Sequence, residues 1–284
     1  MGVSTYPSRQ SKATAGNVLL ARLFKNPACR AGILLLSSTR GARQMQKTVL
    51  ITGGTRGIGA ALVRLCLAQG HAVLATGSSA SSVAAAASNL PGVAWLVCDF
   101  SDPASLPALA GQIGQRPLDL VIHNAGVQQA RSWFAAEPEP IAVETELRIN
   151  FTAPVLLTRL LFDNVAQRNG TWVFVSSGLA IAPKQSAPVY CASKAALRSF
   201  CKSLRGQALV HGSAIRVCEA ILPMVDTGMT AGRGRGKISA AQAAAEIYRG
   251  AQAGHAEIRV GKVRWLMRLR AVLPQVVENL MLKA

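Results

Sequence analysis

The sequence predicts an α/β fold in which one parallel sheet is covered by helices on both faces. Three observations favour this class. Short β-branched runs alternate with longer Ala- and Leu-rich segments from residue 47 onward, the runs lack polar alternation, and the first run leads directly into a glycine cluster. Half of the residues are hydrophobic and 15% are charged, as in packed globular proteins. We therefore expect residues 47–284 to form a single doubly wound domain.

The strands and helices can be placed in order along the chain. The strands of a predicted seven-stranded sheet are residues 47–52, 71–76, 93–98, 118–123, 171–176 and 214–221, with a short last strand at 257–260. Long helices are expected at residues 57–69, 143–168, 188–211 and 239–253. No internal repeat and no linker interrupts this succession.

A basic amphipathic helix is expected after the last strand. Its apolar positions at helical spacing are Trp265, Leu266, Leu269, Val272 and Leu273. Pro274 should break or kink it. One interpretation is a final helix that covers the edge of the sheet, and another is peripheral contact with a membrane surface. No apolar run approaches the roughly 18 residues that a membrane-spanning helix needs.

Residues 1–46 form a basic extension with seven Lys or Arg, no acidic residue, and many Ser, Thr and Ala. Two interpretations are open. The segment is a mitochondrial targeting leader, or it lies upstream of a true start at Met45, after which a buried strand pattern follows at once. We favour the second, which gives a cytoplasmic location, whereas a leader would give a mitochondrial one. In either case we expect the extension to be poorly ordered.

The chain carries 31 Lys and Arg against 13 Asp and Glu, a formal net charge of +18. This charge raises nucleic acid as a partner, but the cations are scattered and form no patch with interleaved aromatic residues, so we expect no such partner. A positive field also attracts a phosphorylated cofactor. The six cysteines lack paired spacing. No metal-ligand spacing is found at His71, His123, His211 or His255, so we expect free thiols and no metal.

The first predicted strand runs into a glycine-rich turn at the start of a helix. The turn reads Thr52-Gly53-Gly54-Thr55-Arg56-Gly57-Ile58-Gly59. Glycines let the backbone turn sharply and let a pyrophosphate approach the amides, while the helix N-terminus supplies partial positive charge. Gly59 leaves room for the helix to pack on the strand. The strand–turn–helix context therefore predicts a dinucleotide site in preference to an ordinary tight loop.

Polar residues farther along the chain have a spacing that suits acid–base chemistry. Tyr190 and Lys194 are four apart on a predicted helix, so their side chains share one face. A free tyrosine has a pKa of about 10, and a nearby ammonium favours the phenolate. We therefore expect Lys194 to lower the pKa of Tyr190. Ser177 ends a strand thirteen residues before Tyr190, and Asn150 lies in a long predicted helix.

The glycine spacing and these residues together resemble the short-chain dehydrogenase/reductase family over nearly all of residues 47–261. Asp99-Phe100 closes the third strand, where the family's aspartate contacts the adenine, and Asn124-Ala125-Gly126 closes the fourth strand as in the family. The resemblance implies the following catalytic roles: Tyr190 protonates the carbonyl oxygen as hydride arrives from the nicotinamide, Ser177 polarises the carbonyl, Lys194 also holds the ribose hydroxyls, and Asn150 positions a water in the proton relay.

The cofactor preference depends on the group that faces the adenosine ribose. An acid after the second strand selects the 2′-hydroxyl of NAD(H), and a cation accepts the 2′-phosphate of NADP(H). The chain has no acid there, and Arg56 occupies the glycine-turn position where NADP-preferring members of the family often have a basic residue. Ser78 stands where the family frequently has an arginine, so phosphate binding would depend on Arg56 and hydroxyl groups. NADP(H) is therefore favoured over NAD(H).

After the sixth strand, residues 222–227 resemble the family's Pro-Gly-x-Val-x-Thr, whose backbone and threonine hold the nicotinamide carboxamide. The matching residues are Pro223, Val225 and Thr227. Met224 replaces the glycine, so we expect the backbone of this loop to differ. The basic loop, Gly232-Arg233-Gly234-Arg235-Gly236-Lys237, lies where the family's substrate loop falls. One interpretation is that its cations contact the cofactor phosphate or an acidic substrate, and the other is a plain flexible loop.

The tail that ends near Met281 resembles the DltE-like bacterial branch of the family. The resemblance implies a cytoplasmic NADPH-dependent oxidoreductase acting on a carbonyl or alcohol substrate. Leu, Met and Trp residues near the end of the cleft suggest a hydrophobic substrate, and core packing explains them equally well. The resemblance also implies a homo-dimer or homo-tetramer assembled through the helices at 143–168 and 188–211. The alternative is a noncatalytic NADPH-binding sensor or scaffold that keeps the fold and uses its basic surface for a partner.

Overall fold

The structure is a computed structural model that describes residues 45–134 and 142–283. The chain divides into two units, Met1–Met45 and Gln46–Ala284. The predicted basic extension, with its two interpretations, lies outside the described residues except for its last two positions. The second unit carries every site residue that the sequence predicts.

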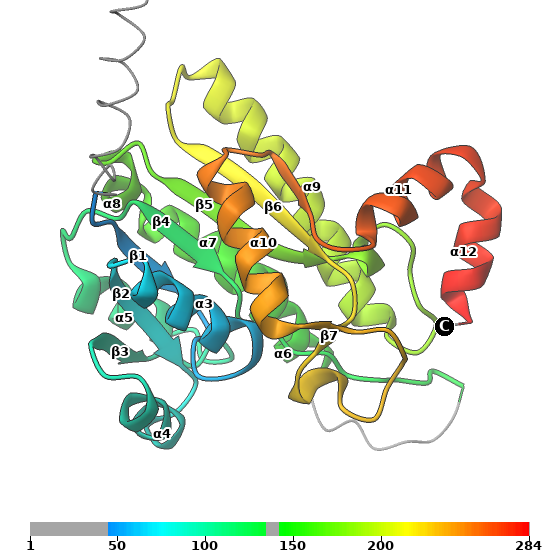
Figure 1. Cartoon of the computed structure of the whole chain (residues 1–284), viewed down its shortest axis with the longest axis horizontal. Helices are drawn as coiled ribbons and strands as arrows, with labels where there is room; N and C mark the ends of the chain where they lie inside the picture. Colours follow the sequence, from blue (N-terminus) through cyan, green and yellow to red (C-terminus); the bar gives the residue numbers. More distant parts are fainter. Residues whose placement is uncertain (1–44, 135–141, 284) are drawn as a thin grey trace, which may run out of the picture. The chain divides into compact units, whose positions relative to one another are not determined.

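A seven-stranded sheet forms the centre of this unit, with the order β3-β2-β1-β4-β5-β6-β9 and every neighbouring pair parallel (Figure 1). Its strands are β1 (Thr48–Ile51), β2 (Ala72–Gly77), β3 (Val93–Val97), β4 (Leu120–His123), β5 (Thr171–Ser177), β6 (Arg216–Leu222) and β9 (Glu257–Arg259). The predicted doubly wound class and the seven strands are confirmed. Because the strand order reverses between β1 and β4, the carboxyl ends of these two strands border the crevice where ligands bind in such sheets.

Helices cover both faces of the sheet. On one face, α3 (Gly57–Ala68) and α10 (Ala240–Gln252) share a core with β1, β5 and β6, and Figure 1 shows both helices on the near side. The opposite core joins the sheet to α5 (Ser105–Ile113), α7 (Ala153–Leu160) and α9 (Pro188–Val210). Two large side chains of β5, Trp172 and Phe174, are buried in this second core. The sheet is thus apolar on both faces, which explains why its strands show no polar alternation.

Two helices were not predicted from the sequence, α4 (Ala80–Asn89) and α5. The α4 segment is almost entirely Ala and Ser and buries only Ala86, so it has no apolar periodicity to read. Its start is fixed locally, because the Ser79 side chain accepts a hydrogen bond from the Ser82 backbone N–H and the Ser82 side chain bonds the Ser79 backbone.

The helix predicted at residues 143–168 is not continuous. It consists of α6 (Val143–Leu147), a π-helical segment η1 (Arg148–Thr152), α7, and α8 (Phe162–Ala166). Pro154 has no backbone N–H and its ring crowds the carbonyl of Asn150 four residues earlier, so the regular helical hydrogen bonds cannot continue through this turn. The widened turn contains Asn150, and π-helical turns are common at functional sites.

The C-terminal segment forms two short helices, α11 (Val263–Val272) and α12 (Pro274–Leu282), which pack on each other. Pro274 occupies the first turn of α12, so the predicted break is confirmed. Leu266 of α11 and Met281 of α12 line the large cleft described below. None of the helices in the described ranges is long and apolar enough to cross a membrane.

All five cysteines of the described residues are buried and free, as predicted. Burial raises the pKa of the Cys66 thiol to about 12, so this thiol remains protonated and packs as an apolar group.

Candidate active site

A cleft of about 1410 Å³ runs along the carboxyl ends of the strands. It extends from the glycine turn and the end of β2, past Ser177 and Tyr190, to α11 and α12. It therefore lies at the point where the strand order reverses, as expected for a ligand site in this fold.

The glycine turn has the backbone conformation that its sequence requires. Gly53 and Gly57 adopt φ values of +65° and +56°, which side chains other than glycine rarely adopt. A Cβ at position 59 would lie 2.0 Å from the carbonyl oxygen of Gly53 and 2.7 Å from the Asn124 side-chain nitrogen. The turn thus leaves a space beside the N-terminus of α3 that suits a pyrophosphate. Position 59 therefore has no room for a side chain, because a Cβ would contact the glycine turn itself and the Asn124 side chain.

Thr52 and Asn124 tie the glycine turn to the end of β4. The Thr52 hydroxyl oxygen accepts hydrogen bonds from the backbone N–H groups of Asn124 at 3.0 Å and Ala125 at 3.1 Å. The Asn124 side chain donates to the carbonyl oxygens of Thr52 at 3.0 Å and Gly53 at 3.1 Å. Thr52 and Gly59 do not line the cleft themselves, so these two predicted cofactor residues position the turn from behind it.

The remaining predicted cofactor residues all line the cleft, namely Gly53, Thr55, Arg56, Gly57, Ile58, Ser78, Asp99, Phe100, Asn124, Ala125, Gly126, Tyr190, Lys194, Pro223, Val225 and Thr227. At the adenosine end, one oxygen of the Asp99 carboxylate accepts two hydrogen bonds from Ser101, at 2.9 Å from its backbone and 2.7 Å from its hydroxyl. Asp99 is therefore held in place at the end of β3.

Asn150 lies beneath the cleft and is fully buried. Its side-chain oxygen accepts a hydrogen bond from the Val127 N–H at 2.9 Å, and its nitrogen donates to the Val127 carbonyl at 2.8 Å and to the Ser193 hydroxyl at 3.3 Å. Asn150 does not line the cleft, so in this structure it connects the segment after β4 to α9.

Ser177 and Tyr190 meet at the floor of the cleft. Both residues line the cleft, and the Ser177 oxygen accepts a hydrogen bond from the Leu179 N–H at 3.1 Å. Burial raises the pKa of Tyr190 to about 12, against the opposing effects of the Ser177 side chain and the Arg233 charge, which lower it. Glu146, which is buried and paired with Arg131 at 3.1 Å, raises this pKa further.

Lys194 is buried one turn after Tyr190, with its ammonium 5.8 Å from the centre of the Tyr190 ring. The ammonium donates a hydrogen bond to the Val175 carbonyl at 2.9 Å, and burial lowers the pKa of Lys194 to about 8. The expectation that Lys194 would lower the pKa of Tyr190 is not met. Desolvation of the tyrosine outweighs the charges around it, and the opposing influences come from Ser177 and Arg233.

At the nicotinamide end, Thr227 lies against the glycine turn, with its methyl group 3.3 Å from where a Cβ on Gly57 would be. Among the described residues, Asn169 is the only non-glycine with a positive φ, so the backbone at Met224 does not require a glycine. The Met224 side chain packs against Gly234 of the basic loop, where it would leave no room for a Cβ.

Sequence reasoning missed several residues that line the cleft, including Arg64, Ser82, Lys184, Met229, Lys262 and Met281. Arg64 could have been found, since it lies two helical turns after Arg56 on the same helix. Lys184 and Met281 gave no local signal, because their places depend on how the segment before α9 meets α12. That meeting includes a hydrogen bond from the Gln185 N–H to the Leu282 carbonyl at 3.3 Å.

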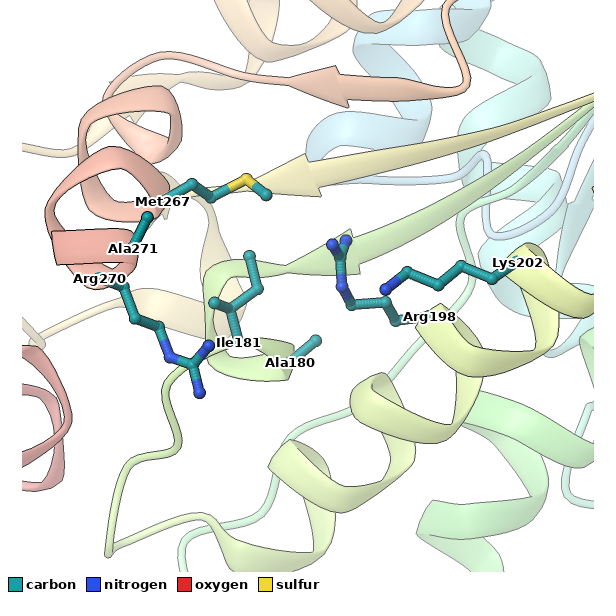
Figure 2. A pocket seen from close by; sticks show the side chains of 7 residues that line it. All are labelled: Ala180, Ile181, Arg198, Lys202, Met267, Arg270 and Ala271. Atoms are coloured by element: carbon teal, nitrogen blue, oxygen red, sulfur yellow. The ribbon is translucent and has the colours of Figure 1, made fainter. Parts of the chain in front are cut away.

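A second cavity of about 300 Å³ lies between α9 and α11 (Figure 2). Its lining residues are Ala180, Ile181, Arg198, Lys202, Met267, Arg270 and Ala271. Two of its cations already have carboxylate partners, Arg198 with Glu219 at 2.6 Å and Arg270 with Glu278 at 2.5 Å. None of the predicted catalytic residues lines this cavity, so we place the active site in the large cleft.

No group of three or more potential metal ligands is found in the part of the chain that the structure describes. His123 is buried, as predicted, and hydrogen-bonds Thr158 at 3.2 Å while stacking on Phe174 at 4.6 Å between ring centres. Burial lowers the pKa of His123 to about 3, so it packs as a neutral core residue.

Comparison with known proteins identifies the class. Residues 47–237 match the short chain dehydrogenase family. The chain is 37% identical over 190 residues to the uncharacterized oxidoreductase DltE of Bacillus subtilis, covering 66% of this chain and 75% of that protein. It is 30% identical over 228 residues to serine 3-dehydrogenase of Rhizobium radiobacter, covering 78% of this chain and 88% of that protein.

Solved structures have the same fold. A short chain dehydrogenase from Burkholderia cenocepacia in complex with NADP has a TM-score of 0.75 and 22% identity, and covers 84% of this chain and 98% of its own. A short chain dehydrogenase/reductase from Burkholderia phymatum in complex with NAD has a TM-score of 0.72 and 18% identity, and covers 81% and 95%.

The sheet order, the glycine turn and the family match together define a dinucleotide-dependent oxidoreductase of the doubly wound α/β class. The chain belongs to the short-chain dehydrogenase/reductase family and is an NAD(P)-dependent enzyme. The predicted resemblance to the family and to DltE is confirmed.

Proposed function

We propose that the chain is an NADPH-dependent reductase that converts an aldehyde or ketone to an alcohol, with Tyr190 as the general acid. The observation that carries this proposal is that Ser177 and Tyr190 line the same cleft, with the Ser177 side chain close enough to Tyr190 to lower its pKa. Two hydroxyl donors this close together suit the binding of a single carbonyl oxygen.

The residues have defined roles in this proposal. NADPH, bound along the cleft, supplies the hydride that adds to the carbonyl carbon. Ser177 donates a hydrogen bond to the carbonyl oxygen, and Tyr190 transfers its proton to that oxygen, which leaves a tyrosinate. The raised pKa of Tyr190 keeps it protonated at neutral pH, as a proton donor requires. Lys194, one turn after Tyr190 and with its ammonium 5.8 Å from the ring centre, binds the ribose hydroxyls of the cofactor, as the resemblance implies.

The preference for NADPH depends on the adenosine end of the cleft. Arg56 and Arg64 line it from the glycine turn and α3, and Ser78 and Ser82 line it from the segment after β2. The one carboxylate among the described lining residues is Asp99, which the resemblance assigns to the adenine. Two cations and two hydroxyls suit a 2′-phosphate better than a free 2′-hydroxyl.

The test is titration of the purified chain with NADPH and NADH by nicotinamide fluorescence, for the wild type and Arg56→Ala. We expect NADPH to bind more tightly and Arg56→Ala to weaken NADPH selectively, by about 10-fold for one charged contact. A preference for NADH would overturn the cofactor assignment and leave the enzyme assignment intact.

The alternative is a noncatalytic NADPH-binding scaffold that uses its basic surface for a partner, favoured by the formal net charge of +18. A panel of aldehydes and ketones separates the two functions. NADPH oxidation that Tyr190→Phe abolishes without loss of NADPH binding supports the reductase. Binding without turnover on the whole panel would favour the scaffold.

We also propose a cytoplasmic homo-oligomer. Apolar side chains are exposed on the two helices that the resemblance assigns to assembly, including Leu156 and Leu160 on α7 and Leu209 and Val210 on α9. Light scattering should give a mass of two or four chains. A monomer at micromolar concentration would contradict the assembly.

A further inference from the structure

The charges along the cleft are strongly unbalanced, and this bears on the substrate of the proposed reductase. The cleft is lined by six cationic side chains, Arg56, Arg64, Lys184, Lys194, Arg233 and Lys262. Among the described lining residues the only carboxylate is Asp99, at the adenosine end. Arg56 and Arg64 lie beside the glycine turn, where the cofactor phosphates account for them. The cations on the other side of the catalytic tyrosine remain unexplained.

The basic loop places one arginine in the cleft and the other in solvent. Gly232, Gly234 and Gly236 adopt φ values of +70°, +63° and +69°, so the backbone reverses repeatedly around the two arginines. Arg233 lines the cleft and lies close enough to Tyr190 to lower its pKa, whereas Arg235 is exposed and does not line the cleft. One guanidinium N–H of Arg233 donates to the Met229 carbonyl, which leaves other donors of this group for a ligand.

Two lysines line the same cleft from other elements. Lys184 precedes α9, and its backbone is fixed by a hydrogen bond from its N–H to the Cys191 sulfur at 3.3 Å. Lys262 precedes α11, and its ammonium lies 3.5 Å from where a Cβ on Gly236 would be, so it lies against the basic loop. Neither lysine forms an ion pair with a carboxylate of the described residues.

Nearby carboxylates are already occupied. Glu146 is fully buried and paired with Arg131, and Asp226 is paired with Lys237 at 3.5 Å. The positive charge around Tyr190 is therefore not neutralised by the described part of the chain. Cations that have no carboxylate partner and lie between apolar walls of low dielectric constant favour binding of an anionic ligand.

The same end of the cleft has apolar walls. Leu179 follows β5, Val263 and Leu266 belong to α11, and Met281 belongs to α12. These side chains leave room for an apolar body beside the cations. An uncharged polar substrate would use neither feature fully.

We propose that the substrate is an anionic carbonyl compound, whose apolar body packs against α11 and α12 and whose carboxylate or similar anionic group is bound by Arg233 with support from Lys184 and Lys262. This inference rests on the proposed reductase function and adds the charge of its substrate. Arg233 acts here as a substrate-binding residue, separate from the proton-donating role of Tyr190.

The test compares an aromatic aldehyde that carries a carboxylate, para-carboxybenzaldehyde, with its neutral methyl ester, methyl para-formylbenzoate, each with saturating NADPH. The wild type should have a kcat/KM about 10- to 100-fold higher for the carboxylate, the range expected for one or two charged hydrogen bonds. Arg233→Gln should abolish this preference, so that the ratio of kcat/KM for the carboxylate to kcat/KM for the ester falls to about 1. Arg235→Gln is the matched control and should retain the preference, because its side chain lies outside the cleft.

Equal kcat/KM for the two aldehydes in the wild type, or a preference that survives Arg233→Gln, would overturn the inference. So would an Arg233→Gln variant that loses NADPH affinity and keeps its preference, since Arg233 would then serve the cofactor. Smaller losses of preference in Lys184→Gln and Lys262→Gln would support the shared site.

The inference can fail separately from the reductase function. Dissociation constants of both probes are measured on the Tyr190→Phe protein saturated with NADPH, where no turnover is needed. Tighter binding of the carboxylate that requires Arg233 supports the inference even if the wild type reduces neither aldehyde. Reduction of both aldehydes without discrimination in rate or binding would retain the reductase and refute the anionic substrate.

Discussion

Asn150 satisfies both backbone polar groups of Val127, accepting from its N–H at 2.9 Å and donating to its carbonyl at 2.8 Å. Both bonds are made by a side chain in the π-helical turn that Pro154 enforces. The segment after β4, which lines the cleft on the nicotinamide side, is therefore held by one amide group. This makes Asn150 a positioning residue in the structure, whatever its contact with a water during catalysis.

Asn150→Ala should lower the free energy of unfolding by about 2–4 kcal/mol, because it removes the fully buried amide and leaves both part-buried backbone groups of Val127 without their partner. Denaturant unfolding measures the loss. Asn279→Ala, at an exposed position of α12, is the control and should change stability by less than about 0.5 kcal/mol. A stability equal to the wild type would show that water or the backbone replaces the amide.

Burial of the Lys194 ammonium should lower the free energy of unfolding at neutral pH, and this contribution should disappear in alkali. The pKa of Lys194 is lowered to about 8 in the folded state, whereas the unfolded chain retains an ordinary lysine. The unfolded state therefore binds more protons between these two pKa values, and this contribution to stability rises with pH across that window. Below about pH 8 the buried charge costs the folded state about 3 kcal/mol.

Lys194→Met should accordingly be more stable than the wild type at pH 7, with the difference falling toward zero by about pH 10. Thermal or denaturant unfolding at both pH values measures it, and the variant should have lost its reductase activity. A variant less stable than the wild type at pH 7 would show that the hydrogen bond to Val175 outweighs desolvation of the ammonium.

The pH profile of carbonyl reduction should fall with an apparent pKa near 8. Tyr190, with its pKa raised to about 12, stays protonated over the usual assay range, so Lys194 is the group of this site that titrates there. Measuring kcat from pH 6 to pH 10 for the wild type and Lys194→Arg gives the assignment, because arginine stays charged throughout. Any activity that Lys194→Arg retains should not fall near pH 8. If the activity of the variant falls near pH 8 as in the wild type, the titrating group is another residue.

The glycine turn offers a matched pair of substitutions. Gly59→Ala should abolish NADPH binding and destabilise the fold, since its Cβ would lie 2.0 Å from the Gly53 carbonyl oxygen. Gly206→Ala, inside α9 with open space around its Cβ position, should be neutral or stabilise by up to about 1 kcal/mol. Fluorescence titration and thermal unfolding test both. Retained NADPH affinity in Gly59→Ala would mean that the turn is not the pyrophosphate site.

The parts of the fold that depend on local chemistry were predictable from the sequence. The glycine turn requires its glycines for backbone reasons, and buried parallel strands read as apolar runs, so both appear in the sequence without knowledge of the partners. The four residues assigned to catalysis were found by their resemblance to a family. Of these, the structure brings Ser177, Tyr190 and Lys194 to the cleft and places Asn150 behind its wall.

Features that depend on tertiary contacts were not predictable. The π-helical turn follows from Pro154, but an isolated proline in a helical pattern more often indicates a break. The high pKa of Tyr190 results from burial, which the four-residue spacing to Lys194 does not reveal. Arg233 lines the cleft and Arg235 is exposed, and the sequence does not distinguish them because each arginine stands between two glycines.

Arg198 of α9 joins three elements, since it pairs with Glu219 of β6 at 2.6 Å and with Glu257 of β9 at 2.7 Å. The Glu219 side chain is fully buried, so Arg198→Met would leave its charge without the main partner. We expect a loss of about 3–5 kcal/mol in the free energy of unfolding at pH 8. Arg259→Met is the control, because the Arg259 side chain, which pairs with Glu257, is 46% exposed. This substitution should lower the free energy of unfolding by less than about 1 kcal/mol.

The loss in Arg198→Met should also depend on pH. Burial already raises the pKa of Glu219 and Arg198 opposes this, so removing Arg198 raises that pKa further. The folded variant then binds a proton that the unfolded chain releases, and its stability falls as pH rises. Denaturant unfolding at pH 5 and pH 8 should therefore give the larger deficit at pH 8, and adding Glu219→Gln should remove most of the difference. An equal deficit at both pH values would show that lost packing of the arginine, and not the stranded carboxylate, causes the destabilisation.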